Sequence, residues 1–220
     1  MAGEGTLSYW FRLEPKNHGE WIDWYIRDHM PSRLTTTFTG ARCFQRVDGS
    51  PFFMALYTTL TPEALVAPEY LDLLRSASED DKRRRAWYQD TMRGCLRKSA
   101  DAGYGSGGIV GCVRYSVKEA GTQNPDKTLS AIAGTLQKVD GIGRVTCLKA
   151  DPEIRRTMDG ARVTGHDDLS VDRVILVECS AENDLRAAFD TLEALPDWKS
   201  LTGDVPKVTE AYRLLYEVSR

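Results

Sequence analysis

The sequence of 220 residues lacks several features that would assign it to a class directly. It has no apolar run of the length that spans a bilayer. Its first residues do not form a basic segment followed by an apolar one, so we expect no signal peptide. The net charge of −3 and the pI near 5.7 argue against a surface built for nucleic acid. We therefore expect a cytoplasmic protein with neither a membrane nor a nucleic acid as its partner.

Residues for metal and redox sites are also scarce. The three histidines, His18, His29 and His166, show no HxH or HExxH spacing, whereas a metal centre needs three or four convergent ligands. The five cysteines are scattered without a CxxC pair, so we predict reduced, buried thiols. A GxSxG elbow and a dinucleotide-binding glycine fingerprint are both missing. We expect no metal and no cofactor.

The hydrophobic content of 41% and the charged content of 28% are ordinary for a protein with a real core. Residues 1–103 predict the order β-α-β-β-α-β of a ferredoxin-like unit. The dipeptide Asp48-Gly49 predicts a hairpin turn between its second and third strands. The strands are expected at 7–13, 39–47, 52–60 and 95–100, and the helices at 20–34, 63–74 and 82–92.

The same pattern then begins again. A glycine-rich linker at 104–108 separates the first repeat from a second one at 109–220, which contains a long connection at 151–171. We predict an α+β protein made of two tandem ferredoxin-like repeats, packed sheet to sheet through their bare faces as an internal dimeric α+β barrel. The long connection could be a lid or an oligomer arm.

The predicted first helix carries an unusual aromatic face. Trp21, Trp24, Tyr25 and His29 recur at i, i+3, i+4 and i+8, so they share one side, and each has a polar tip that needs a partner when buried. The corresponding helix of the second repeat, 127–138, offers only aliphatic residues on its face. Packing alone therefore does not demand the aromatic set, which predicts one active pocket, in the first repeat. A core stripe with a satisfied histidine is the alternative.

The segment 20–31 resembles the first helix of EthD-like members of the dimeric α+β barrel superfamily, and 40–46, 53–57 and 67–70 are similar to the same group. The match covers roughly 7–100 and is topological elsewhere. The superfamily includes muconolactone isomerases, polyketide cyclases, cofactor-free quinone-forming monooxygenases, haem-degrading enzymes and aldoxime dehydratases. The resemblance implies a pocket between helices and sheet in which small organic molecules react, and it does not choose the reaction.

Two residues are predicted to be catalytic. His29 serves as a general acid or base, because burial among aromatic rings lowers its pKa and keeps it neutral at pH 7. Tyr25, one turn earlier, orients the ring or donates a proton. Arg33, four residues after His29, is a candidate to hold a carboxylate or phenolate, although a surface arginine at a helix end is the alternative. His166 is expected to be an exposed loop residue.

Aromatic residues supply the predicted substrate-binding walls. Trp21 and Trp24 suit a flat substrate, and Tyr9, Phe11 and Tyr57 alternate along the first and third strands. The sequence does not say which strand face lines the pocket.

We expect a cofactor-independent lyase or isomerase that acts on a small aromatic or polyketide-like molecule. One alternative is a non-catalytic ligand-binding or stress-related barrel, and another is a haem- or oxygen-dependent monooxygenase. The expected partner is a small, aromatic substrate. A homodimer is compatible with this arrangement and is not required by it.

Overall fold

The computed structural model describes residues 4–117, 124–163 and 167–220. The chain forms two compact units, and neither is one continuous stretch of sequence. Unit 1 consists of Met1–Arg97, Ala150–Ser170 and Leu215–Arg220, and unit 2 of Lys98–Lys149 and Val171–Leu214. Within the described residues, no helix has the length and apolarity needed to cross a bilayer.

The sheet of unit 1 is antiparallel apart from one short edge strand. Its order is β2-β3-β1-β4-β7, and only β7 runs parallel to its neighbour, β4. Gly49, at φ 75°, forms the turn between β2 and β3 and confirms the predicted hairpin. The strands are β1 (Gly5–Arg12), β2 (Phe38–Arg46), β3 (Phe52–Thr59), β4 (Gln89–Gly103) and β7 (Leu169–Ser170).

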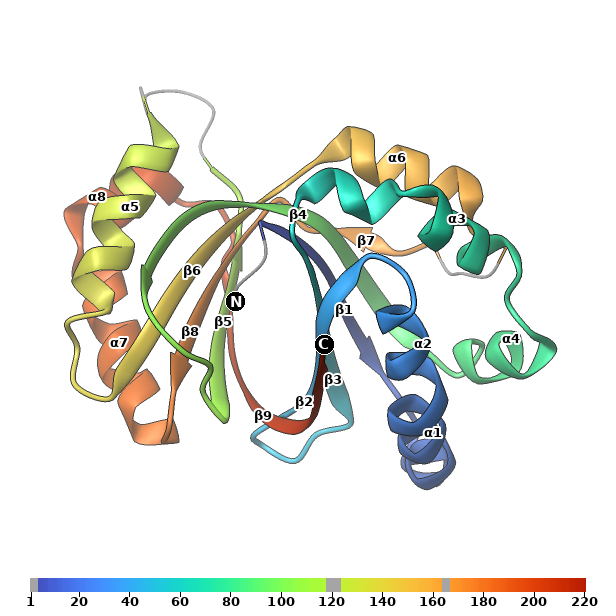
Figure 1. Cartoon of the computed structure of the whole chain (residues 1–220). Coiled ribbons are helices and arrows are strands. Elements are labelled where there is room, and N and C mark those ends of the chain that lie inside the picture. Colours follow the sequence, from blue (N-terminus) through green and yellow to red (C-terminus); the bar gives the residue numbers. More distant parts are fainter. Residues whose placement is uncertain (1–3, 118–123, 164–166) are drawn as a thin grey trace. The chain divides into compact units, whose positions relative to one another are not determined.

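Helices cover one face of this sheet (Figure 1). Register pairs Leu7 with Tyr57 and Phe11 with Phe53, so odd-numbered residues of β1 and β3 share the covered face and form the core with the helices. The helices are α1 (His18–Trp24), a π-helical turn (Tyr25–His29), α2 (Met30–Leu34), α3 (Pro68–Arg75), α4 (Glu79–Arg85) and α6 (Pro152–Ala161), with 3-10 turns at Pro15–Asn17 and Pro62–Val66.

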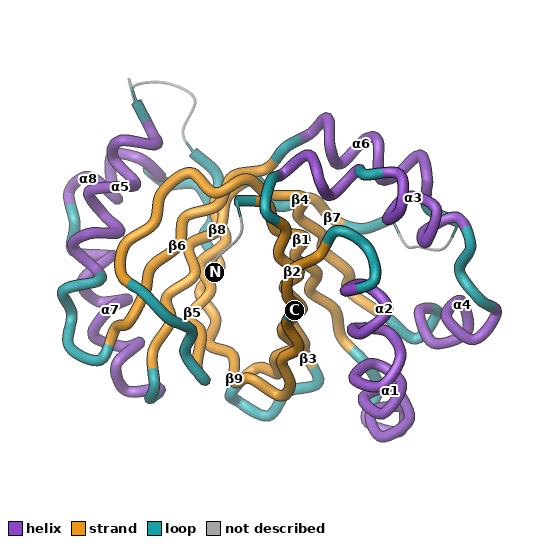
Figure 2. The backbone as a smooth tube through the Cα atoms, in the orientation of Figure 1, coloured by secondary structure: helices purple, strands orange, loops and turns teal. Residues whose placement is uncertain are grey.

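Unit 2 has its own antiparallel sheet, in the order β9-β5-β8-β6, and its own helices (Figure 2). The predicted stripe of Leu129, Ile132, Ala133 and Leu136 on its first helix is buried in the core of this unit. The elements are β5 (Ile109–Tyr115), α5 (Pro125–Leu136), β6 (Ile142–Ala150), β8 (Arg173–Cys179), α7 (Glu182–Ala194), α8 (Pro196–Thr202) and β9 (Val208–Ser219).

The described residues of the predicted connection at 151–171 belong to unit 1 as far as Ser170, and Val171 begins a segment of unit 2. Asp151 caps α6 by accepting hydrogen bonds from the backbone N–H groups of Glu153 and Ile154. Ile154 and Met158 then enter the core of unit 1. These buried contacts fix α6 against the unit. His166 lies outside the described residues.

The predicted helix at 82–92 is wrong in its second half. Helix α4 ends at Arg85, and β4 begins at Gln89 and pairs with β1 as far as Arg97. Tertiary contacts override the local helical pattern here, because the residues of β4 form backbone hydrogen bonds with β1 that a short helical extension would lose.

Candidate functional site

The aromatic helix is not a regular α-helix. Between α1 and α2 it widens into a π-helical turn at Tyr25–His29, in which the N–H of Met30 bonds to the carbonyl of Tyr25. Pro31 gives a local reason, because it has no N–H to donate to the preceding turn. The expected helix at 20–34 is therefore present, with Pro31 inside it. Such turns occur frequently at functional sites.

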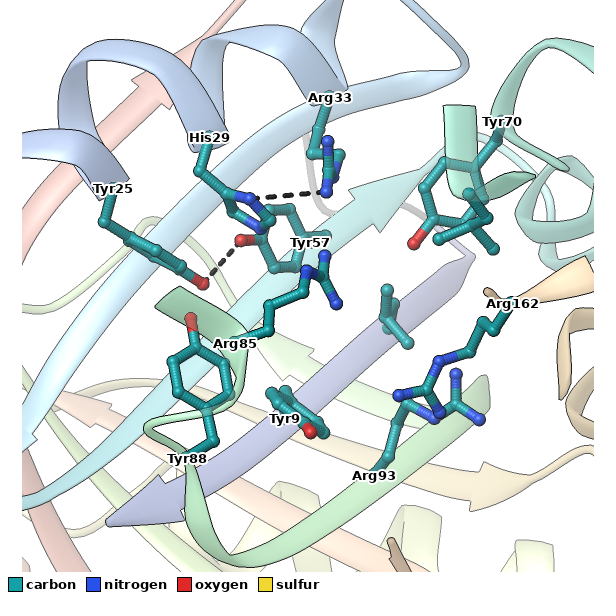
Figure 3. A pocket seen from close by; sticks show the side chains of 12 residues that line it. Tyr9, Tyr25, His29, Arg33, Tyr57, Tyr70, Arg85, Tyr88, Arg93 and Arg162 are labelled. Atoms are coloured by element: carbon teal, nitrogen blue, oxygen red, sulfur yellow. Dashed lines mark hydrogen bonds between the residues drawn. The ribbon is translucent and has the colours of Figure 1, made fainter. Parts of the chain in front are cut away.

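A pocket with a cavity volume of about 40 Å³ lies in unit 1 between this turn, the sheet and helices α3, α4 and α6 (Figure 3). Phenol and guanidinium groups dominate its wall, and no carboxylate is among the described residues that line it. The lining residues are Leu7, Tyr9, Tyr25, His29, Arg33, Tyr57, Tyr70, Leu74, Arg85, Tyr88, Arg93 and Arg162.

His29 is held in one tautomer by its neighbour. Its Nδ1 lies 3.3 Å from Nη2 of Arg33, and a guanidinium only donates hydrogen bonds, so Nδ1 accepts. Burial, followed by the charges of Arg33 and Arg85, holds the pKa of His29 well below its usual value. The neutral ring thus carries its proton on Nε2. It offers the pocket an N–H donor, and the lone pair that a general base needs at Nδ1 is already engaged.

Two phenols meet beside His29. The hydroxyls of Tyr25 and Tyr57 are 2.5 Å apart, and the ring of Tyr25 stacks on that of His29 with centroids 4.8 Å apart. Burial is the main cause that raises the pKa of both tyrosines above the usual value. Both phenols are therefore neutral near pH 7, and they act as hydrogen-bond donors or proton carriers and not as anions.

Five of the eight residues predicted for the site line the pocket. They are His29, Tyr25, Arg33, Tyr57 and Tyr9.

The other three predicted residues lie behind the lining and support it. Trp21 donates from Nε1 to the Tyr88 hydroxyl at 2.9 Å and stacks on Tyr25. Trp24 packs against His29, with ring centroids 4.7 Å apart. Phe11 stacks on Tyr88 at 4.2 Å. In this structure the two tryptophans and Phe11 belong to the core of unit 1 and pack behind the lining residues of the pocket.

Several lining residues escaped sequence reasoning. Arg85 ends the basic run 82–85, a pattern that is typical of a solvated helix face. Arg83 and Arg84 do form ion pairs with Glu20 of α1 at the surface, but Arg85 reaches the pocket. Arg162 directly follows α6, far along the chain from the first helix, and no local pattern announces it. Tyr70, Tyr88 and Arg93 were missed because their side of the element depends on tertiary packing.

Arg33 is a buried cation without a carboxylate. Arg33 is 6% exposed and donates a hydrogen bond to Ser32 Oγ at 2.8 Å. It forms no ion pair with any of the described acids. Burial is the main cause that lowers the pKa of Arg33, and the charge of Arg85 lowers it further. The lowered pKa means that the charged form of Arg33 is less favourable here than in water. Because burying a cation without a partner is costly, this end of the pocket favours an anionic ligand.

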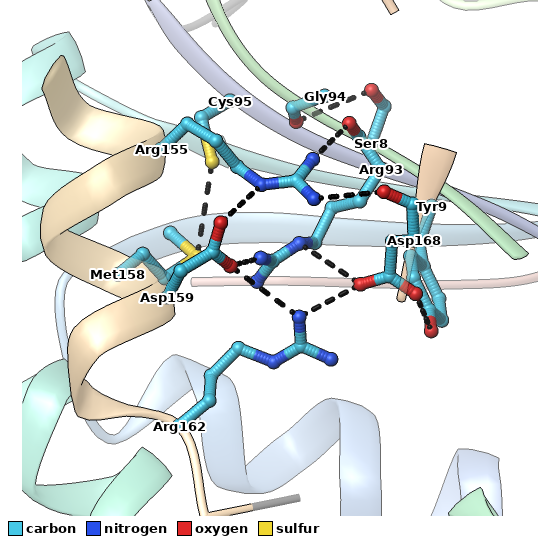
Figure 4. Close-up of polar contacts among 10 residues, drawn as sticks. All are labelled: Ser8, Tyr9, Arg93, Gly94, Cys95, Arg155, Met158, Asp159, Arg162 and Asp168. Carbon is cyan, nitrogen blue, oxygen red and sulfur yellow. Dashed lines mark hydrogen bonds and ion pairs between the residues drawn. The ribbon is translucent and has the colours of Figure 1, made fainter. Parts of the chain in front are cut away.

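The charges of two other lining arginines, Arg93 and Arg162, are balanced by carboxylates. Asp168 accepts from Nη1 of Arg162 at 2.7 Å, lies 3.3 Å from Nε of Arg93 and accepts from the Tyr9 hydroxyl at 2.8 Å (Figure 4). Asp159 pairs with Arg93 as well. Burial would raise the pKa of Asp168, but the charge of Arg162 and hydrogen bonds from its neighbours lower it. Asp168 is therefore a buried anion.

Comparison with known proteins finds relatives by structure only. No family profile matches the sequence, and no curated protein matches it. An anthrone oxidase-like protein superposes with a TM-score of 0.68 at 11% identity, covering 98% of this chain and 92% of the other. A protein from Lactobacillus acidophilus provisionally assigned as a monooxygenase gives 0.59 at 10% identity, covering 98% and 96%. A heme-binding protein from Thermus thermophilus gives 0.55 at 9% identity, covering 98% and 92%.

These likenesses show the fold. The neighbours have the α+β barrel fold, which agrees with the predicted α+β class, whereas the EthD-like branch and the tandem repeat stay predictions. The expected cofactor-independent lyase or isomerase is contradicted, because the neighbours are named for oxidation, chlorite dismutation and heme binding. The alternative of oxidative chemistry agrees better with them. Because this fold supports many different reactions, a fold predicted from the sequence does not identify the reaction.

A haem does not fit the pocket of unit 1. The cavity of about 40 Å³ has no room for a macrocycle without opening, so the fit depends on the residues that could hold the iron. His29, the one histidine among the described lining residues, has Nδ1 bonded to Arg33 and its ring packed against Tyr25 and Trp24. The described residues also contain no group of three or more histidines, cysteines and acids that could hold a metal ion.

Proposed function

We propose that the protein is an oxidative enzyme that binds a small phenol or enol as its anion beside Arg33 and His29 and exposes it to dioxygen. The observation that carries this proposal is the buried guanidinium of Arg33, which has no carboxylate partner among the described acids and lies at the pocket wall. An anionic oxygen would receive charge-assisted hydrogen bonds from Arg33 and the Nε2–H of His29. The oxidative names of the structural neighbours support the same reaction class.

The described lining of the pocket provides no base for an unactivated substrate. His29 has its Nδ1 engaged, and the phenols of Tyr25 and Tyr57 are too weakly acidic to exist as anions near pH 7. The substrate must therefore be acidic enough to arrive deprotonated, or to lose its proton to water when it meets the arginines, which lower the pKa of a bound phenol. Acidic phenols and enols of fused aromatic ketones have this property.

The chemistry balances with dioxygen as the oxidant. The electron-rich anion transfers electrons to dioxygen and forms a C–O bond at a carbon that bears hydrogen and is conjugated with the oxyanion. Protonation gives a hydroperoxide. Loss of that C–H proton then breaks the O–O bond and releases water, which leaves a carbonyl at the carbon. A CH₂ group and O₂ become C=O and H₂O, and the arginines stabilise the negative charge as it moves from one oxygen to the other.

A ring-sized substrate requires the wall to open, because the cavity holds about 40 Å³. Helix α4, which carries Arg85, contains no buried residue. The other helices at the pocket enter the core of unit 1, as Tyr70, Leu74, Ile154 and Met158 show. Opening at α4 therefore breaks the fewest buried contacts.

We also infer that the active half is the first of two repeats, 1–103, and that 109–220 is mainly structural, with 104–108 as the linker. The regular, aliphatic α5 supports this division, since its counterpart carries the π-helical turn. Arg162 is an exception, because the second half of the sequence supplies it to the pocket. The segments that resemble EthD-like proteins include Tyr25, His29, Tyr57 and Tyr70, all lining residues, which supports that branch.

The test is oxygen uptake with a panel of anthrones, naphthols and nitrophenols, measured with an oxygen electrode and followed by mass spectrometry of the products. We expect uptake with acidic members of the panel, a product heavier by one oxygen and lighter by two hydrogens, and loss of activity in Arg33→Met. Absence of uptake across the panel, together with a His29-dependent Soret band on titration with haem, would overturn the proposal in favour of haem chemistry.

A further inference from the structure

The two ends of the pocket differ in what surrounds their arginines. Figure 3 shows His29 and Arg33 together at one end and Arg93 and Arg162 together at the other, with Arg85 between them. The first end has a buried cation without a described carboxylate. At the second end, both lining arginines have carboxylates within ion-pair distance.

Asp168 is the residue that creates this difference. Its side chain is 0% exposed and it does not line the pocket, yet it contacts three residues that do: Tyr9, Arg93 and Arg162. Asp159 contributes less, because its side chain is 43% exposed and it is shared with Arg155. The charge that matters at this end is therefore the buried carboxylate of Asp168.

We infer that Asp168 sets the selectivity of the pocket, so that the substrate carries one anionic group, at Arg33, and a neutral oxygen at the Arg93–Arg162 end. A second anion there would be repelled by the buried carboxylate of Asp168. A carbonyl or hydroxyl oxygen would not. Toward the described acids, Arg162 uses Nη1 alone, so Nε and Nη2 keep N–H groups for such an oxygen.

Asp168 acts as a positioning residue in this arrangement. It accepts a hydrogen bond from the Tyr9 hydroxyl, which directs that hydroxyl away from the bound anion, and it holds both guanidinium groups at the wall. Arg155 reinforces the arrangement by donating to the backbone carbonyls of Arg93 at 2.6 Å and Asp168 at 3.1 Å. This inference rests on the proposed anion site at Arg33.

Two probes of equal length and rigidity test it by calorimetry at pH 7. Terephthalate is a dianion, whereas 4-acetylbenzoate is a monoanion with a neutral carbonyl at the far end. We expect wild-type protein to bind 4-acetylbenzoate about tenfold more tightly than terephthalate, and Asp168→Asn to reverse this preference. The amide keeps the shape of the side chain and removes its charge. Asp159→Asn is the matched control and should change the ratio of affinities by less than about threefold.

The ratio of two affinities in one protein separates selectivity from folding, since a general loss of structure weakens both probes alike. Equal affinities in wild-type protein, or a ratio unchanged in Asp168→Asn, overturn the inference. The wild-type ratio decides the matter if Asp168→Asn does not fold. Failure of the anion site looks different: wild-type protein then binds neither probe, or Arg33→Met binds both as well as wild type.

Discussion

At the scale of single residues, one hydrogen bond decides what the buried histidine can offer. The contact between Arg33 and His29 fixes the proton on Nε2 and turns the ring into a donor. A sequence pattern shows that the two residues are one helical turn apart, but not that both are buried. The same four-residue spacing on an exposed face would have left the guanidinium in water.

Removing the cation should separate stability from activity. Arg33→Met replaces a buried charge that has no described carboxylate partner by an apolar side chain of similar length, so we expect the free energy of unfolding to stay level or rise by about 1–3 kcal/mol. Oxygen uptake with an acidic phenol should fall by about a hundredfold or more. Urea unfolding and an oxygen electrode measure the two effects.

The matched control is Arg27→Met. Arg27 belongs to the same helical segment but is exposed and paired with Asp23, so its loss should change stability and activity little. A large loss of stability in Arg33→Met would show that this arginine is structural.

The titration of His29 gives stability a predictable pH dependence. Its pKa lies well below the unfolded value of about 6.5, so below that pH the unfolded chain binds a proton that the folded protein does not. The contribution is fully present above pH 6.5 and is lost as pH falls towards the folded pKa, at up to about 1.4 kcal/mol per pH unit. Urea unfolding at pH 7, 6 and 5 should show a smaller loss in His29→Gln than in wild type. Equal losses would contradict the buried, neutral histidine.

The site was predictable where side chains repeat along one element. His29, Tyr25 and Arg33 follow from helical spacing, and Tyr9 and Tyr57 from strand alternation. Arg93 and Arg162 were not predictable, because their place in the pocket depends on how α6 packs against β4 and on a carboxylate, Asp168, that is distant in sequence from Arg93. Trp21 and Trp24 lie one layer behind the lining of the pocket, because helical spacing shows which side of a helix a residue is on but not how deeply it is buried.

At the scale of elements, α4 is attached to unit 1 by ion pairs of its side chains and not by packing into the hydrophobic core. It has no buried residue, and Arg83 and Arg84 join it to Glu20 of α1. Ion pairs of this kind, with a half-exposed carboxylate, contribute about 0–1 kcal/mol each and weaken with salt. The helix that delivers Arg85 to the pocket is therefore the element of the wall that opens most easily.

Glu20→Gln should loosen α4 with little effect on the fold. We expect faster amide exchange in the peptide 79–88, a similar acceleration of the wild type in 1 M salt, and a loss of global stability below about 1 kcal/mol. Exchange measured by mass spectrometry checks this.

Glu63→Gln is the control, because Glu63 forms a similarly exposed pair with Arg97 at 2.8 Å elsewhere in unit 1. If both variants leave the exchange of α4 unchanged, the helix is anchored by other contacts.

At the scale of the whole molecule, the fold was far easier to predict than the reaction. Alternating and helical hydrophobic patterns specify strands and helices in both halves, and the same fold persists in neighbours at 11% identity or less. The proposed reaction would depend on a few side chains that are brought together from distant parts of the sequence, such as Asp168 and Tyr9. Residues 150–170 also join unit 1 against the order of the chain, which periodicity does not reveal.

The thiols report on both units at once. No disulfide joins the five cysteines, all of which lie in the described part of the chain and are buried. Burial raises the pKa of Cys179 to about 11 and that of Cys147 to about 12, which further slows their reaction. We expect negligible labelling by a thiol reagent in the native protein and five labels in denaturant without a reductant. Fewer than five in denaturant would reveal a disulfide.

The π-helical turn depends on the number of residues in this segment of the chain. Compared with a regular helix, the turn at Tyr25–His29 accommodates one residue too many, and Pro31 needs that wider turn because a regular one would press its ring against a carbonyl. Deletion of Arg27 should cost about 3 kcal/mol, and Pro31→Ala should recover most of that loss in the shortened chain. The rescued protein would fold around a straight helix in which Tyr25 and His29 no longer stack, and we expect it to have lost the proposed anion site. The one extra residue in the π-helical turn would then be what creates the pocket beside Tyr25 and His29, in a helix that would otherwise only pack into the core.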